Sequence, residues 1–208
     1  MIRPERTSLD LAAVVSRLSP HLEEARSRGF LGPGPVQPHI HHAWPLVRVL
    51  PAEGIGVDLG SGAGVPGLIL ALAQPGVRWV LVDSQQRRSL WLSQVVDALD
   101  LDCQVVGQRA EEVGRGPWRA TASVVVARSF AAPAVTAECA APLLQVGGML
   151  WVAEPPEPSL DRWPRDGLAE LGLASTASVP GWAGLRQERL CGERYPRRVG
   201  IPGKRPLF

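Results

Sequence analysis

A glycine-rich segment between two apolar runs constrains this chain most. Residues 56–67 read Gly-Val-Asp-Leu-Gly-Ser-Gly-Ala-Gly-Val-Pro-Gly, and residues 68–73 are all apolar. Such an order is typical of a strand, a tight turn and a helix. Gly60, Gly62 and Gly64 can adopt positive φ angles and place no Cβ against a ligand, while the first amides of the helix point into the same space. The segment therefore predicts a loop that holds a nucleotide.

An acidic residue in this loop indicates which nucleotide is held. Asp58 lies two residues before Gly60, at the carboxyl end of the predicted strand. A pyrophosphate site needs only backbone amides and a helix N-terminus, whereas a carboxylate suits a cation. S-adenosylmethionine (SAM) carries an ammonium and a sulfonium and no phosphate. We therefore expect SAM rather than NAD, although Gly62 to Gly67 also fits the dinucleotide fingerprint, which alone is weak evidence.

Further apolar runs predict the rest of an α/β fold. Strands are expected at 78–83, 104–106, 123–127 and 149–153. Helical patterns lie between them, and this alternation is typical of a mostly parallel sheet. Two segments around Pro180-Gly181 predict a terminal antiparallel hairpin, with strands at 174–179 and 187–191. The fold class expected is a Rossmann-like SAM-dependent methyltransferase fold with N-terminal helices.

Acidic residues after two of these strands indicate how a nucleoside is held. Asp83 ends the second predicted strand, where a carboxylate can accept hydrogen bonds from both ribose hydroxyls. Ala110 and Glu111 follow the third strand and are placed to reach the adenine. Arg128 follows the fourth. The carboxyl ends of parallel strands meet at one edge of a sheet, so these residues are expected to lie together.

Length and composition predict one soluble domain. The 208 residues, 45% of them hydrophobic, suffice for a single core, with a helical extension and loop at 1–50 and the α/β core at 51–208. No apolar run approaches the ~20 residues that span a bilayer, and no signal sequence opens the chain, so we expect no membrane and a cytoplasmic protein. Three cysteines without metal-ligand spacing, and His39 and His42 without a carboxylate, predict neither disulfide nor metal.

Basic residues are concentrated at the C-terminus. Residues 186–208 hold seven basic and two acidic side chains, a footprint typical of a polyanion partner. Interleaved Pro and Gly predict an extended arm rather than a helix. A solvated surface remains an alternative, as does an internal role for Arg197 as a cap of sheet carbonyls or a partner of an internal carboxylate. The residues expected to bind RNA are Arg197, Arg198, Lys204 and Arg205.

Several motifs together resemble one family, the small-subunit (16S) ribosomal RNA guanine-N7 methyltransferases, also called the glucose-inhibited division protein B family. The resemblance covers roughly His39 to the end of the chain. The motifs that carry the resemblance are His39-Ile40, the loop 58–67, Leu81-Val82-Asp83-Ser84 with Arg87-Arg88 and Leu92, Arg109-Ala110-Glu111, Ala127-Arg128-Ser129-Phe130, and the tail 195–207. The family's Lys-Gly after the fifth strand falls on Glu154-Pro155 here, and the chain has no asparagine for the family's N-terminal segment.

The resemblance implies residue roles and a partner. Cofactor contacts are implied at Gly60, Val65, Ala110, Glu111 and Arg128, with Arg128 and the tail near the RNA base. The implied partner is ribosomal RNA or the 30S subunit, and we expect a monomer.

The implied reaction needs no general base. Guanine N7 has an in-plane lone pair and can attack a sulfonium methyl without first losing a proton. Methylation of exocyclic amines typically uses an Asn/Asp-Pro-Pro-aromatic turn, and cytosine C5 methylation uses a cysteine. Residues 127–130 (Ala-Arg-Ser-Phe) contain neither that turn nor a cysteine, so we expect Arg128 to position the base.

Two other function classes stay open from the sequence. One is a SAM-dependent enzyme acting on a small molecule or another RNA, which Glu154 favours. The other is a module that binds SAM or RNA without catalysis. Salt-dependent RNA binding and formation of S-adenosylhomocysteine would separate the three classes.

Overall fold

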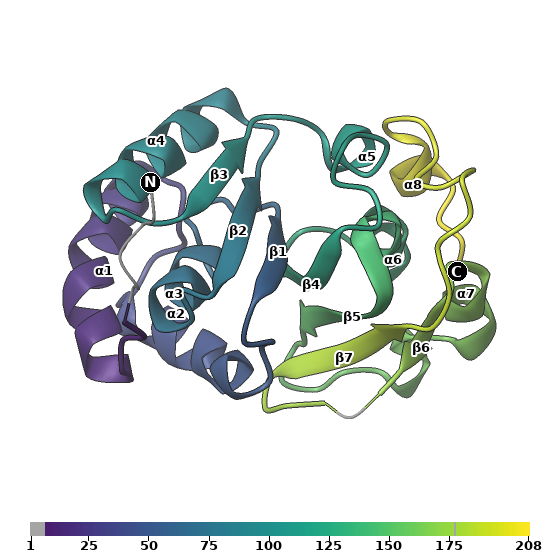
Figure 1. Ribbon diagram of the computed structural model, residues 1–208, viewed down its shortest axis with the longest axis horizontal. Helices are drawn as coiled ribbons and strands as arrows, with labels where there is room; N and C mark the ends of the chain where they lie inside the picture. The colour runs from purple at the N-terminus through teal and green to yellow at the C-terminus, as the bar shows by residue number, and fades with distance from the viewer. Residues whose placement is uncertain (1–6, 177) are drawn as a thin grey trace.

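The computed structural model describes residues 7–176 and 178–208, which form one seven-stranded sheet with helices on both faces (Figure 1). The strand order is β3-β2-β1-β4-β5-β7-β6. Strands β1 to β5 run parallel, and β7 is antiparallel to both β5 and β6, as expected. The strands are β1 (Gly54–Leu59), β2 (Val77–Val82), β3 (Cys103–Val106), β4 (Ala122–Ala127), β5 (Leu144–Ala153), β6 (Leu173–Ser175) and β7 (Trp182–Gln187).

The helices form two layers. Figure 1 shows α1 to α4 on one side of the sheet and α5 to α7 on the other. The first six residues of the expected N-terminal extension lie outside the described residues. In the described part of the chain, no helix combines the length and apolar character that crossing a bilayer requires. The helices are α1 (Leu11–Ser27), α2 (Gln37–Ala43), α3 (Gly67–Ala73), α4 (Gln86–Ala98), α5 (Ala110–Val113), α6 (Pro133–Ala140), α7 (Arg165–Glu170) and α8 (Ile201–Lys204).

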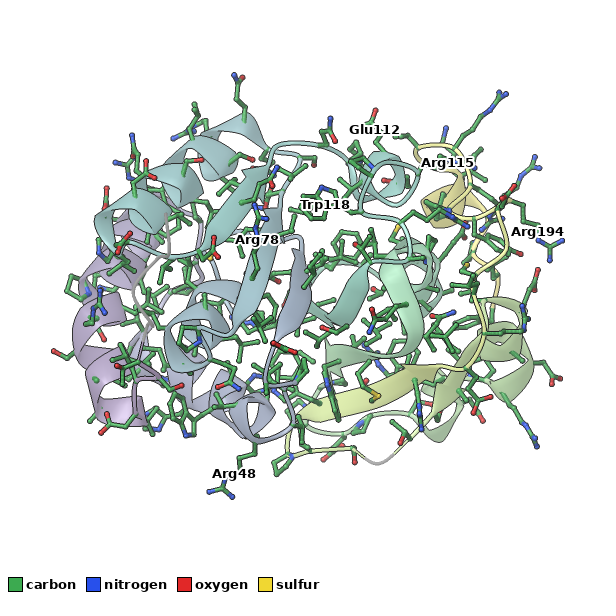
Figure 2. All side chains as sticks on the ribbon, viewed as in Figure 1. Arg48, Arg78, Glu112, Arg115, Trp118 and Arg194 are labelled. Atoms are coloured by element: carbon green, nitrogen blue, oxygen red, sulfur yellow. The ribbon has the colours of Figure 1, made fainter. Side chains whose placement is uncertain are left out.

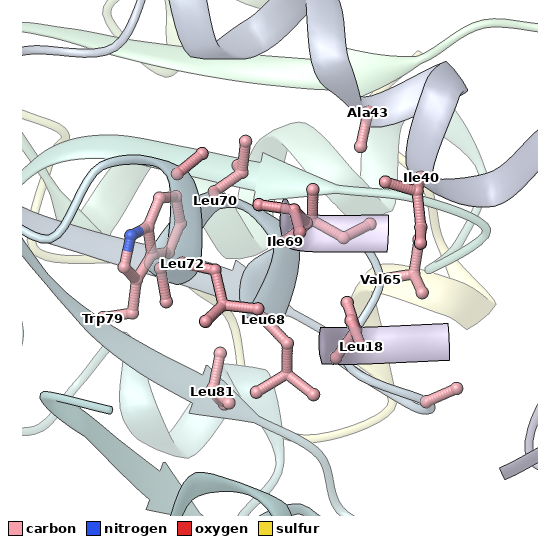
Figure 3. Packing of buried hydrophobic residues seen from close by; sticks show 14 of the residues in the cluster. Leu18, Ile40, Ala43, Val65, Leu68, Ile69, Leu70, Leu72, Trp79 and Leu81 are labelled. Carbon is pink, nitrogen blue, oxygen red and sulfur yellow. The ribbon is translucent and has the colours of Figure 1, made fainter. Parts of the chain in front are cut away.

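The apolar runs of the central strands feed two cores. Successive side chains of a strand point to opposite faces, so Trp79 and Leu81 join the core under α1 to α4, while Val80 and Val82 join the core under α5 to α7. Figure 3 shows Trp79 and Leu81 packed with the leucines of α3. Burial on both faces explains why these strands read as continuous apolar runs.

The terminal hairpin is present, but its strands differ from the predicted bounds. The first was expected at 174–179, where residue 177 lies outside the described residues, and the structure places β6 at Leu173–Ser175. The second strand is shifted as well. We expected residues 187–191, and the structure places β7 at Trp182–Gln187. Pairing with β5, with Leu150 opposite Leu185, fixes this strand. Gln187 ends β7 and pairs with Leu173 of β6, and only residues 188–191 continue beyond the strand toward the tail.

The expectation of an extended C-terminal arm is wrong. Residues 201–204 form α8, which begins after Gly200 at φ 79°. Pro202 lies in the first turn of α8, where its missing N–H costs nothing. The tail packs against α5 and α6, and Arg115 donates a hydrogen bond of 3.2 Å to the Arg194 carbonyl. In Figure 2 the side chain of Arg194 projects outward from this end of the molecule.

Candidate active site

The glycine loop joins β1 to α3 in a conformation that side chains would obstruct. Gly60, Gly62 and Gly64 have φ angles of 70°, 55° and 79°. A Cβ on Gly60 would lie 2.7 Å from Cδ2 of Phe130. The backbone of the loop therefore approaches the segment after β4 more closely than any other residue type permits.

Asp58 braces this loop from beneath. Its side chain is buried, and Oδ2 accepts a hydrogen bond of 3.0 Å from the backbone N–H of Gly67. Oδ1 has no hydrogen-bond partner among the described residues. Burial raises the pKa of Asp58 to about 7, although the Gly67 N–H opposes this. An unpaired buried carboxylate oxygen is chemically suited to a cationic ligand group.

Asp83 connects the glycine loop to the start of α4. Its Oδ2 accepts a hydrogen bond of 2.9 Å from the N–H of Gly62, and its Oδ1 accepts one of 2.8 Å from Gln85. The carboxylate is 5% exposed and lies at the carboxyl end of β2. Asp83 thus holds two turns in place while bordering the pocket that they enclose.

The pocket that Asp83 borders, which we name the glycine-loop pocket, lies over the carboxyl ends of β1 and β2 and the start of α5. It brings together four of the predicted cofactor residues, namely Gly60, Asp83, Ala110 and Glu111. Gly62 acts through its N–H to Asp83. The side chain of Val65 is instead buried in the core beside α2, so only its backbone belongs to the loop.

Glu111 also contacts the C-terminal tail. Its Oε1 accepts a hydrogen bond of 3.0 Å from the N–H of Gly200, and Arg109 lies 3.6 Å from its Oε2. Burial opposes ionisation, yet the Gly200 hydrogen bond and the Arg109 charge hold the pKa of Glu111 below its usual value. The pocket and the tail therefore share this side chain.

A second pocket of about 510 Å³ lies beside the first, within the size range of small-ligand sites. We name it the Arg128 pocket. It is lined by residues of α2 and α6, by the carboxyl ends of β4 and β5, and by the segments that follow these two strands: Pro38, His39, His42, Ala127, Arg128, Ser129, Phe130, Ala131, Thr136, Val152, Ala153, Glu154, Pro155 and Arg162. Arg128 therefore borders this pocket and not the glycine-loop pocket.

His39 is a pocket residue that the sequence indicated only as a metal ligand to be excluded and as part of the family motif His39-Ile40. Nη2 of Arg128 lies 3.0 Å from Nδ1 of His39, and because a guanidinium can only donate, Nδ1 accepts. Burial and the Arg128 charge lower the pKa of His39, so the ring is neutral at pH 7. Over the described ranges, no cluster of three or more His, Cys, Asp or Glu side chains could hold a metal ion.

Glu154 forms part of the β5 side of the Arg128 pocket. Its Oε1 accepts hydrogen bonds from Nε of Arg162 at 3.1 Å and from Nε1 of Trp163 at 2.9 Å. The Glu154 side chain is 10% exposed. The negative charge at this position is therefore paired within the same pocket wall.

One short segment divides the two pockets. Ser129, Phe130 and Ala131 border both of them, and Ser129 has a left-handed φ of 54°. Phe130 packs against the core under α5 to α7 and also forms part of this shared wall. None of the four predicted RNA-binding residues of the tail borders either pocket.

Comparison with known proteins identifies the family. The sequence model of the rRNA small subunit methyltransferase G family matches residues 36–154. A protein of that name from Syntrophomonas wolfei is 32% identical over 84% of this chain and 87% of its own length, and one from Carboxydothermus hydrogenoformans is 37% identical over 73% and 70%. The crystal structure of the antibiotic-resistance methyltransferase Kmr shares the fold, with a TM-score of 0.52 and 18% identity over 70% of this chain and 93% of that one. The chain belongs to the rRNA small subunit methyltransferase G family.

Proposed function

We propose that this protein transfers a methyl group from SAM to N7 of a guanine in small-subunit ribosomal RNA. The observation that carries the proposal is the pair of pockets at the carboxyl edge of β1 and β4, separated only by residues 129–131. A cofactor in one and a base in the other would meet at this wall. The names of the family relatives support RNA as the substrate.

The polar groups around the glycine-loop pocket support SAM as its ligand. Asp83 and the backbone of Gly60 and Gly62 would hold its ribose and amino-acid parts, and Ala110 and Glu111 its adenine. The unpaired Oδ1 of Asp58 would act on the ammonium from beneath the loop. Val65 contributes through the backbone conformation, and Arg128 acts from the neighbouring pocket.

The chemistry that SAM supplies when bound is an electrophilic methyl: the N7 lone pair forms the new C–N bond, the C–S pair stays on sulfur, and the positive charge passes to the base. N7 carries no proton, so the chain needs no general base. Its task is alignment, which can contribute roughly 7–11 kcal/mol.

Arg128 is the residue that we assign to positioning the base. Arg128 borders the pocket, its Nη2 is fixed by the neutral His39, and Phe130 lies in the wall that the two pockets share. A side chain whose orientation is set by a second residue loses little entropy when it binds. Arg128 therefore orients the base without taking or giving a proton.

We further infer a monomer of one domain without a bound metal, which acts in the cytoplasm on the 30S subunit or its RNA. The continuous sheet and its two cores support the single domain. Arg198, Lys204 and Arg205 are exposed and available to phosphates, whereas Arg197 is turned inward.

The test uses 30S subunits from a strain that lacks the gene. The protein and SAM should restore N7-methylguanosine at one position, read by chain cleavage at that base. Methylation of another atom, or of no ribosomal RNA, would refute the proposal, and transfer to small molecules alone would favour a small-molecule enzyme.

A further inference from the structure

The carboxylate of Glu154 is held at the edge of the Arg128 pocket by one of its two oxygens. Arg162 and Trp163 both donate to Oε1. No described residue donates a hydrogen bond to Oε2, and Oε2 is not one of the buried polar atoms that lack a partner. The carboxylate is thus oriented by fixed donors and keeps one accessible acceptor oxygen in a wall of the pocket.

The order of the strands places Glu154 opposite the glycine loop. The loop follows β1, Arg128 follows β4 and Glu154 follows β5, and these three strands are neighbours in that order. A base in the Arg128 pocket whose reactive edge faces the loop therefore turns its opposite edge toward β5. For guanine with N7 toward the loop, that opposite edge carries N1–H and the 2-amino group.

The chemistry of that edge matches a carboxylate. N1–H and the 2-amino group of guanine are adjacent donors, and an ionised carboxylate only accepts. Adenine offers an acceptor at N1, so a carboxylate there discriminates against it. Methylation at N7 also leaves the base positively charged, and a fixed negative charge stabilises charge that develops in the transition state.

We propose that Glu154 is the specificity residue that reads the N1–H and 2-amino edge of the target guanine. Arg162 and Trp163 are positioning residues that aim its carboxylate. This inference rests on the proposed function, because it takes guanine N7 as the methyl acceptor. It also assigns a purpose to the glutamate that stands where the resembled family has lysine.

The experiment compares two RNA substrates and three proteins. Small-subunit RNA is assembled by ligation with guanosine or inosine at the mapped target, then reconstituted into 30S particles. Inosine lacks only the 2-amino group. Wild type, Glu154→Gln and the control Glu157→Gln are compared by kcat/KM, and the control removes an exposed charge three residues away. Glutamine keeps an oxygen for Arg162 and Trp163 but turns an amide donor toward the base.

We expect Glu154→Gln to lower kcat/KM on guanosine roughly ten- to a hundredfold, mostly through kcat. The guanosine-to-inosine ratio should fall about tenfold in this variant and stay unchanged in Glu157→Gln. Comparing this ratio between proteins cancels the intrinsic difference in N7 reactivity between guanosine and inosine, because that difference is the same for every protein. SAM affinity by calorimetry and the melting temperature should match wild type.

Equal losses on the two substrates, or a wild-type enzyme that methylates inosine as well as guanosine, would overturn the assignment. The wild-type comparison needs no variant, so it holds even where Glu154→Gln fails to fold. Failure of wild type to methylate guanosine at N7 would instead refute the proposed function. The two failures are therefore distinguishable.

Discussion

Arg197 and Glu138 form a two-pronged ion pair that ties the C-terminal tail to α6. Nε of Arg197 donates to Oε1 at 2.8 Å, and Nη2 donates to Oε2 at 2.5 Å. The backbone N–H of Arg197 also donates to Oε1, at 2.8 Å. The Glu138 side chain is 1% exposed, so this ion pair is largely shielded from solvent.

Arg197→Ala should therefore destabilise the fold. Removing one member of a buried pair costs about 3–5 kcal/mol, and for a chain of this size the melting temperature should fall by roughly 6–20 °C. Arg198→Ala is the matched control, because Arg198 is adjacent and exposed, and it should melt close to wild type. Equal melting temperatures of the two variants would contradict the structural role of Arg197.

Arg198, Lys204 and Arg205 should contribute to RNA affinity and not to folding. Each phosphate contact that is lost lowers the salt slope of binding by about 0.7–0.9. We expect the triple alanine variant to flatten the slope of log affinity against log salt by about 2 at unchanged melting temperature and SAM affinity. A slope equal to that of wild type would mean that these charges do not touch RNA.

Asp58 should make stability depend on pH. Its pKa of about 7 in the folded state lies above the ordinary 3.8, so the folded protein binds the extra proton between these values. Stability from this group is present below about pH 4 and is lost as pH rises through 7. Asp58→Asn keeps an oxygen for Gly67 and removes the titration, so the unfolding free energy of wild type relative to this variant should fall from pH 4 to 8. Parallel profiles by denaturant titration would contradict the assignment.

Asp83→Ala should weaken SAM and S-adenosylhomocysteine equally, since both carry the ribose. Losing hydrogen bonds to a charged group costs about 1.5–3 kcal/mol, roughly ten- to a hundredfold in affinity. Calorimetry with both ligands measures this. A change for SAM alone would place Asp83 near the sulfonium end, and unchanged affinities would remove it from the site.

The sequence predicted the central strands because each is an apolar run with local boundaries. It placed β7 wrongly because pairing with β5 decides that strand, and Gly184 within it weakens the local pattern. The internal ion pair of Arg197, which the sequence left open as an alternative to RNA binding, is confirmed, but its partner Glu138 lies 59 positions away and no local spacing reveals it. His39 was missed as a pocket residue for the same reason, since its neighbour Arg128 lies 89 positions away.

The wall formed by Ser129, Phe130 and Ala131 belongs to both pockets, so neither occupant can shift it without changing the surface that meets the other. With SAM in one pocket and the base in the other, as we propose, we expect the two binding equilibria to be linked. Such linkage is reciprocal: if bound SAM changes the affinity for RNA by some factor, bound RNA changes the affinity for SAM by the same factor. S-adenosylhomocysteine lacks the methyl group that would lie at this wall. The change in RNA affinity that it causes can therefore be compared with the change that SAM causes. The difference measures how strongly bound RNA distinguishes the spent cofactor from the methyl donor.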